Sequence, residues 1–242
     1  MRDLFHRQLD VLVLQLAHMC DLTAIAIRKA TDALLDNDLQ LAEQVIADDH
    51  VLDEARDRVE HDVQLLLALQ SPVCGDLRTI LAVALSVERV ERMGDLAEHV
   101  ALAVRRSHPD PVLPAPLRAR FEQMATIATR SAVTAGWAVR GSNPVLCREL
   151  DTLDHEVNDL HRSLFAVLSC AEWRHGVTAG VEAALLSRYY ERFADHAVSV
   201  ARRISTAYSS NSASTSSASV LPSAASLRSS SRSPRSPASS TS

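Results

Sequence analysis

Six long segments with helical apolar patterns, separated by proline and turn residues, constrain this chain most. The breaks fall at residues 36–38, Ser71-Pro72, residues 109–116, Asn143-Pro144 and His175-Gly176. The segments between them cover approximately residues 4–36, 39–70, 73–107, 115–140, 144–172 and 176–207. Apolar residues recur in each segment at the three- and four-residue spacing of one helix face, which predicts six amphipathic helices.

The predicted core stripes can be read directly from this spacing. In the first segment the stripe contains Leu9, Leu12, Val13, Leu16, Met19 and Cys20. In the last segment it contains Leu185, Phe193, Ala197, Val200 and Ile204. Composition agrees with helices, because Ala, Leu and Arg are good helix formers and the 242 residues include only six Gly. We therefore expect an all-α fold.

An internal repeat divides these helices into two groups of three. The heptad ERMGDLA at residues 91–97 recurs as ERFADHA at residues 191–197, and Leu52-Asp53 recurs as Leu153-Asp154. Helices longer than about 25 residues are typical of bundles, and short connections favour antiparallel neighbours. We predict two pseudo-symmetric three-helix bundles, over residues 1–108 and 117–207, joined by a Pro-rich linker over residues 109–116.

The C-terminal end differs in composition from this helical body. Seventeen of the last 34 residues are Ser, and none is acidic. Such a segment buries too little apolar surface to offset its ordering entropy, so we predict a disordered tail over residues 208–242. The net charge is −5, and the tail contributes only Arg, so the helical body is more negative still. An acidic body argues against nucleic acid as a partner.

Cysteine usage and hydropathy predict a cytoplasmic protein. The four cysteines form no CxxC pair, which favours free thiols in a reducing compartment. The N-terminus has no signal-peptide pattern, and the longest uninterrupted apolar run, residues 65–69, is far too short to span a bilayer. We expect contact with a membrane only through a partner.

Carboxylates at helical spacing form the most distinctive polar pattern. The third segment carries Glu88, Glu91, Asp95 and Glu98 on one stripe. Further pairs at three- or four-residue spacing are Glu191 and Asp195 on the sixth segment, Asp49 and Asp53 on the second, and Asp151 and Asp154 on the fifth. Antiparallel packing would bring four carboxylates together at one seam in each half. Like charges at this spacing repel, so the stripe gains stability only where cations neutralise it.

Two interpretations of these carboxylates remain open from the residues. Oxygen ligands suit hard cations such as Mg, Mn or Fe, which predicts one metal site in each half. Alternatively, the acids form ion pairs with arginines: Arg92 can reach Glu88, and Arg188 or Arg192 can neutralise the sixth segment.

No catalytic motif accompanies the carboxylates. The chain lacks a Walker loop, a Gly-rich dinucleotide loop and a G-x-S-x-G sequence. The Glu-x-x-His pair that di-iron oxidase bundles need on two helices occurs once, at Glu172 and His175. We predict a protein that is not an enzyme and has no organic cofactor.

The repeated heptad resembles a motif of the PhoU family of phosphate-transport accessory proteins. That motif is close to E-R-[IM]-[GA]-D-x-A-x-N-[IV], and the chain reads ERMGDLAEHV at residues 91–100 and ERFADHAVSV at residues 191–200. The sequence SPVCGDLR at residues 71–78 is similar to the family's Q-P-V-A-x-D-L-R turn, and Asp49-x-x-x-Asp53 also matches. The resemblance covers approximately residues 1–207.

The resemblance implies a cytoplasmic, often dimeric protein that links the phosphate ABC transporter to a sensor histidine kinase. In that role it would negatively regulate phosphate uptake and the phosphate-starvation response. Some members bind iron or other metals through the acidic motifs. Carried over, the first metal site would use Asp49, Asp53, Glu91 and Asp95, and the second Asp154, Glu191 and Asp195. The alternative is a carboxylate-bridged iron protein with a storage or redox role.

Departures from the family motif affect the two sites differently. The family Asn is replaced by His99 in the first copy and Ser199 in the second, and Leu150 stands where Asp49 has its counterpart. The second site therefore has fewer acids, so we expect the first to hold metal more tightly. On this count, Asp95→Ala should lower bound metal more than Asp195→Ala.

Overall fold

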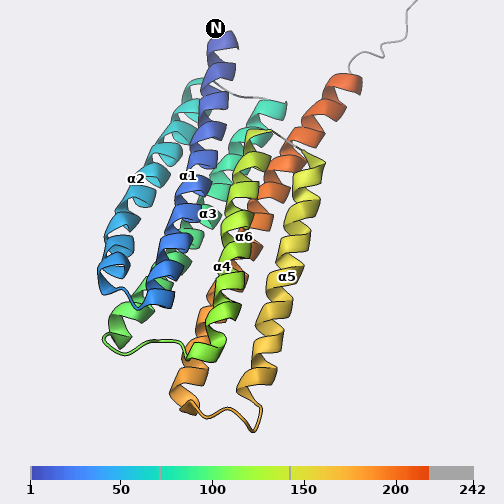
Figure 1. The fold of residues 1–242 in the computed structure, drawn as a ribbon. Helices are drawn as coiled ribbons and strands as arrows, with labels where there is room; N and C mark the ends of the chain where they lie inside the picture. Colours follow the sequence, from blue (N-terminus) through green and yellow to red (C-terminus); the bar gives the residue numbers. More distant parts are fainter. Residues whose placement is uncertain (1, 71, 73, 142, 218–242) are drawn as a thin grey trace, which may run out of the picture.

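The computed structural model describes residues 2–70, 72, 74–141 and 143–217, and these form a bundle of long helices (Figure 1). The helices are α1 (Arg2–Asp36), α2 (Leu39–Gln70), α3 (Cys74–Ser107), α4 (Arg118–Arg140), α5 (Pro144–Leu168) and α6 (Gly176–Ser217). A short 3-10 turn, η1 (Ala115–Leu117), precedes α4. The described part of the chain contains no strand, and the all-α prediction is confirmed.

Polar residues at the breaks explain where the helices stop and start. Asn37 adopts a left-handed backbone with a φ of 53°, which Asn tolerates better than most residues and which ends α1. The Asp38 carboxylate then accepts the Leu41 N–H at 3.0 Å and caps α2. At α5 the Asn143 side chain accepts the Val145 N–H at 2.9 Å, and Pro144 occupies the first helical position.

The two halves pack into one body with one core. In the first half α1, α2 and α3 all contact one another, and α4, α5 and α6 do the same in the second. The halves meet through α1 against α4 and α3 against α6, so α2 and α5 lie on the outside (Figure 1). Buried residues from all six helices belong to one continuous hydrophobic cluster. The seams that α2 and α5 form with their neighbours, including α2–α3 and α5–α6, therefore lie near solvent.

A buried tyrosine links the halves at the centre of this core. The Tyr190 side chain on α6 is fully buried, and its hydroxyl lies 2.6 Å from the hydroxyl of Thr31 on α1. Its ring meets Phe121 on α4 edge-to-face, with 5.9 Å between ring centroids.

Most of the predicted core stripe is buried, with one exception. All six predicted α1 positions, from Leu9 to Cys20, are at most 8% exposed. On α6 the prediction for Leu185 is wrong, because its side chain is 46% exposed while neighbouring Leu186 is fully buried. The core stripe of α6 continues from Tyr190 through Leu186 to Ala183, which turns Leu185 towards solvent.

Two predicted boundaries also shift. Helix α5 ends at Leu168, four residues before the predicted end of its segment. Helix α6 continues to Ser217, so residues 208–217 of the predicted disordered tail are helical. Residues 218–242 of that tail, and Ser71 and Val73 of the turn motif, lie outside the described residues.

Helix α1 is apolar enough to meet the length and hydropathy criterion for a membrane-crossing helix. Over Asp3–Asp36 the mean hydropathy reaches 1.6, and half of the most apolar stretch is buried inside the bundle. There α1 contacts α2, α3 and α4. The central helix of a bundle passes the same criterion, because its apolar residues face neighbouring helices. The sequence of α1 contains no long uninterrupted apolar run, because polar residues recur along it.

Candidate functional site

The first carboxylate face, formed by Asp49, Asp53, Glu91 and Asp95, lies on the α2–α3 seam. Close packing of the two helices creates it. At Gly94 on α3 an added Cβ atom would overlap Cδ2 of Leu52 on α2 and would lie 3.4 Å from an Asp49 carboxylate oxygen. The missing side chain lets α3 approach α2 closely enough for acids on both helices to interact.

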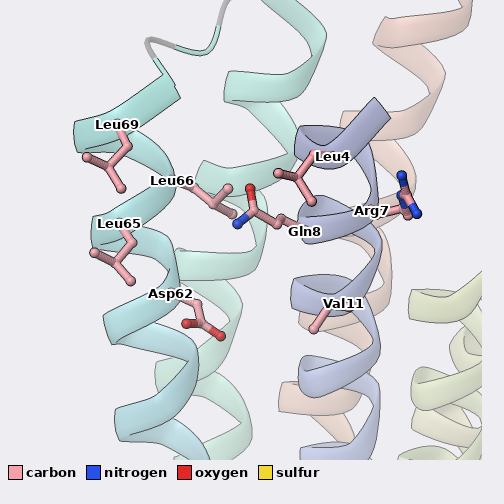
Figure 2. A pocket seen from close by; sticks show the side chains of 8 residues that line it. All are labelled: Leu4, Arg7, Gln8, Val11, Asp62, Leu65, Leu66 and Leu69. Carbon is pink, nitrogen blue, oxygen red and sulfur yellow. The ribbon is translucent and has the colours of Figure 1, made fainter. Parts of the chain in front are cut away.

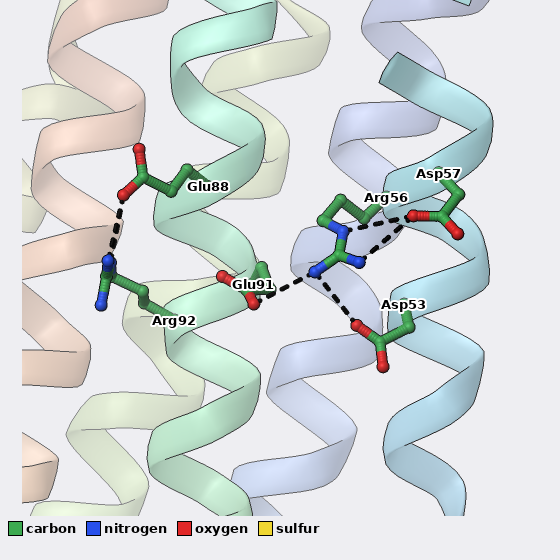
Figure 3. A network of polar contacts seen from close by, with 6 residues as sticks. All are labelled: Asp53, Arg56, Asp57, Glu88, Glu91 and Arg92. Carbon is green, nitrogen blue, oxygen red and sulfur yellow. Dashed lines mark hydrogen bonds and ion pairs between the residues drawn. The ribbon is translucent and has the colours of Figure 1, made fainter. Parts of the chain in front are cut away.

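An arginine lies between the two helices of this face (Figure 3). Nη1 of Arg56 on α2 is 3.2 Å from Glu91 Oε1 and 3.3 Å from Asp53 Oδ1. Its Nη2 is 3.2 Å from Asp57 Oδ1. Burial opposes the charge of Arg56, but the hydrogen bond to Asp57 and the charges of Asp53 and Glu91 outweigh it and raise its pKa. Arg56 thus bridges α2 and α3 as a permanent cation.

Asp49 lies one turn before Asp53 on α2, and its environment disfavours the ionised carboxylate. Its pKa is raised to about 6, mainly because the side chain is partly buried and then because of the negative charges of Glu98, Asp53, Asp95 and Glu91. Burial and Asp95 likewise raise the pKa of Glu91, although Arg56 and Arg92 partly offset this. Negative charge is therefore crowded around Asp49, at the end of the face away from Arg56.

We expect Asp49→Asn to stabilise the metal-free protein at neutral pH. The folded pKa of Asp49 lies above its unfolded value, so the ionised form destabilises the fold. This cost is absent below about pH 4, grows up to about pH 6 and is complete above it. After allowance for solvent screening, the gain from Asp49→Asn should be roughly 1 kcal/mol at pH 7.5.

Urea unfolding with chelator at pH 4.5 and pH 7.5 measures this effect. Asp159→Asn is the matched control, since the Asp159 side chain is 79% exposed and pairs with Arg162 on its own helix. An advantage of Asp49→Asn that does not grow with pH would contradict the prediction.

The second carboxylate face, formed by Asp154, Glu191 and Asp195, lies on the α5–α6 seam. Burial and then the charge of Asp195 raise the pKa of Asp154. Burial also raises the pKa of Glu191; Arg188 opposes this shift, and Asp195 and Asp154 add to it. The Glu191 side chain is 13% exposed, and its Oε2 makes no hydrogen bond within the described part of the chain although Arg188 Nη1 lies 2.5 Å away. These three acids therefore share one electrostatic environment, as the repeat predicts.

These contacts bear on both interpretations of the carboxylates, metal binding and pairing with arginine. The predicted arginine pairs are present: Arg92 lies 3.1 Å from Glu88, and Arg188 contacts Glu191. Among the described residues, no group of three or more His, Cys, Asp or Glu side chains is placed to hold a metal ion. The seams thus supply crowded carboxylates of the type that hard cations prefer, but not an assembled set of ligands.

Sequence reasoning missed Arg56 as a member of the first face. It follows Asp53 by three residues and precedes Asp57 directly, so its spacing marks it as a partner for both acids. Its contact with Glu91 depends on how α2 and α3 are rotated against each other. Asp151, predicted with the second face, helps to raise the pKa of Asp154 and also pairs with Arg202 of α6 at 2.7 Å.

An apolar groove lies apart from both faces, where α1 begins and α2 ends (Figure 2). Its volume is about 370 Å³, and Leu4, Val11, Leu65 and Leu69 line it with exposed side chains. Asp62, also on its wall, accepts a hydrogen bond from Gln15 at 2.8 Å. The groove and the first carboxylate face are separate surfaces of α2.

Comparison with known proteins places this doubled architecture in a family. The family model described as the PhoU domain matches twice, over residues 16–104 and 121–204. The chain belongs to the PhoU family. Each match falls within one three-helix half and contains one copy of the repeated heptad.

Relatives and solved structures extend this result. The chain is 46% identical over 204 residues to the phosphate-specific transport system accessory protein PhoU homolog 2 of Mycobacterium bovis, covering 84% of this chain and 96% of the relative. It is 45% identical to PhoU homolog 1 of Mycobacterium leprae, over 84% and 92% of the two chains. The fold matches the PhoU crystal structure from Streptococcus pneumoniae with a TM-score of 0.75 at 21% identity, over 84% and 96% of the chains.

Family membership fixes the general class of function. PhoU proteins are regulatory accessory proteins of phosphate transport and not enzymes, which confirms the prediction that this chain is not an enzyme. The chain is therefore a phosphate-transport accessory protein.

Proposed function

We propose that this PhoU-family protein is a cytoplasmic negative regulator of phosphate uptake and of the phosphate-starvation response. It acts as an adaptor between the phosphate ABC transporter and a sensor histidine kinase, as a homodimer. The identity of 46% over the whole helical body with a phosphate-specific transport accessory protein carries this proposal. A rigid bundle with separate acidic and apolar surfaces supports it, because an adaptor needs two binding surfaces and no reactive group.

The proposal includes cation binding by the carboxylate faces. The cation is hard (Fe, Mn or Mg), and the acids are Asp49, Asp53, Glu91 and Asp95 in the first half and Asp154, Glu191 and Asp195 in the second. The raised pKa values of Asp49, Asp154 and Glu191 support this part, since crowded negative charge is relieved by a bound cation. Such a cation would tie α2 to α3 and α5 to α6.

A carboxylate-bridged iron store is the alternative, and the contacts favour it less. An iron store depends on a complete set of ligands, which the described residues do not assemble, whereas the adaptor role does not depend on bound metal. Iron-loaded protein that is coloured and reacts with peroxide would favour this alternative over the adaptor.

A phosphate-starvation reporter in the native host tests the adaptor. In phosphate-rich medium, deletion of this gene and of any paralogue should switch the reporter on, because the kinase is no longer held inactive. The intact gene should silence it again. A chain that ends at Ser217 is a matched control, and we expect it to silence the reporter equally well. A reporter that stays off without either copy would contradict the proposal.

Association with the partners is a separate measurement. Tagged protein from phosphate-rich cells should co-purify with the transporter ATPase and the kinase, and recovery should fall under starvation. Equal recovery in both media would argue against an adaptor that responds to phosphate supply.

A further inference from the structure

Arg56 joins carboxylates on both helices of the first face. Its guanidinium lies within 3.3 Å of Asp53, Asp57 and Glu91, which come from α2 and α3 (Figure 3). The Arg56 side chain is 31% exposed and that of Glu91 25% exposed, so the pair is partly shielded from solvent. A guanidinium keeps its charge at every physiological pH and offers several N–H donors in a fixed plane. It therefore provides the positive charge that a metal ion would otherwise bring between Asp53 and Glu91.

Among the described residues, no arginine pairs with two acids of the second face. In the repeat, Leu52-Asp53 aligns with Leu153-Asp154, which places Val157 at the position of Arg56. Val157 is fully buried and cannot neutralise an acid. Arg188 contacts Glu191 from the same helix, and Arg202 contacts Asp151 rather than Asp154. Arg202 nevertheless spans α5 and α6 through Asp151, and its charge lowers the pKa of Asp154.

We infer that Arg56 is an intramolecular counter-ion that occupies the cation position between Asp53 and Glu91, so that a metal ion binds this pair only when Arg56 leaves it. The inference rests on the cation-binding part of the proposed function. Because the same carboxylate oxygens serve the guanidinium, added metal must break those ion pairs first.

Manganese binding to the full-length protein tests the competition directly. Asp195→Asn weakens the second face, so that Mn²⁺ binding in this background reports the first. Adding Arg56→Gln should tighten Mn²⁺ binding about tenfold, equivalent to about 1.4 kcal/mol, because a positive charge is removed from the ligands. Glu91→Gln should abolish that gain. Equilibrium dialysis and the Mn²⁺ electron paramagnetic resonance signal give independent readouts.

Two further variants separate local competition from a general change of charge. Arg92→Gln removes the same charge from α3, but Arg92 pairs with Glu88 on its own helix at an exposed position, so affinity should change less than about twofold. Arg56→Lys keeps the charge and should bind Mn²⁺ as weakly as the parent. A second measurement covers the folded state: in chelator Arg56→Gln should lower the melting temperature, and Mn²⁺ should restore it.

The outcomes distinguish this inference from the proposed function. Equal Mn²⁺ affinity with and without Arg56→Gln overturns the inference. If the wild type binds Mn²⁺ and Asp195→Asn removes that binding, the metal-binding part of the proposed function is still supported. Binding by Arg56→Gln but not by the wild type supports the inference and removes metal from the proposed function. If no variant binds Mn²⁺, both fail. The reporter assay judges the regulatory role independently of all three results.

Discussion

Replacing Tyr190 with alanine should lower the free energy of unfolding by about 3–5 kcal/mol. The side chain is fully buried where the two halves meet, between Thr31 of α1 and Phe121 of α4. Removing the ring leaves a cavity that long, mutually braced helices cannot easily close. Urea unfolding followed by circular dichroism measures the change.

Two controls identify the source of this effect. Tyr190→Phe removes only the hydroxyl and should cost about 1 kcal/mol, because the Thr31 hydroxyl keeps its bond to the Ile27 carbonyl at 2.7 Å. Tyr189→Ala removes a neighbouring, partly exposed ring that stacks on His99 and should cost less than Tyr190→Ala. Equal losses at both tyrosines would show that the junction between the halves is not the critical part of the core.

Replacing Gly94 with leucine should lower the free energy of unfolding by about 3 kcal/mol. Even the Cβ atom of a new side chain would overlap Leu52, which is itself buried against α3. Helix α2 must then move away from α3, and the bridge from Arg56 to Glu91 crosses that same seam. The gain in helix propensity over glycine, about 1 kcal/mol, is too small to compensate.

Gly180→Leu on α6 is the matched control for this substitution. An added Cβ there meets Trp173 at an ordinary contact distance of 3.7 Å, so the substitution should be neutral or stabilising by up to about 1 kcal/mol. Thermal unfolding of both variants gives the comparison. If Gly94→Leu were as stable as Gly180→Leu, the close approach of α2 and α3 would have no energetic weight.

The sequence by itself determined the helices and the repeat. Helix ends depend on nearby residues, such as the left-handed Asn37 and the Asp38 cap, and these signals are visible in the chain. The spacing of apolar residues along α1 predicted its buried face, because this spacing is also a local property of the sequence. The acids of both faces also followed from spacing, since residues three or four apart share one side of a helix.

Only the tertiary structure decided which charges meet across helices. Arg56 and Glu91 are 35 residues apart in the chain, and their contact depends on the rotation and spacing of α2 against α3, which Gly94 permits. The exposure of Leu185 and the junction of Tyr190 with Thr31 likewise depend on how whole helices pack. Local patterns specify the face of each helix, whereas the partner of that face is set by contacts between distant segments.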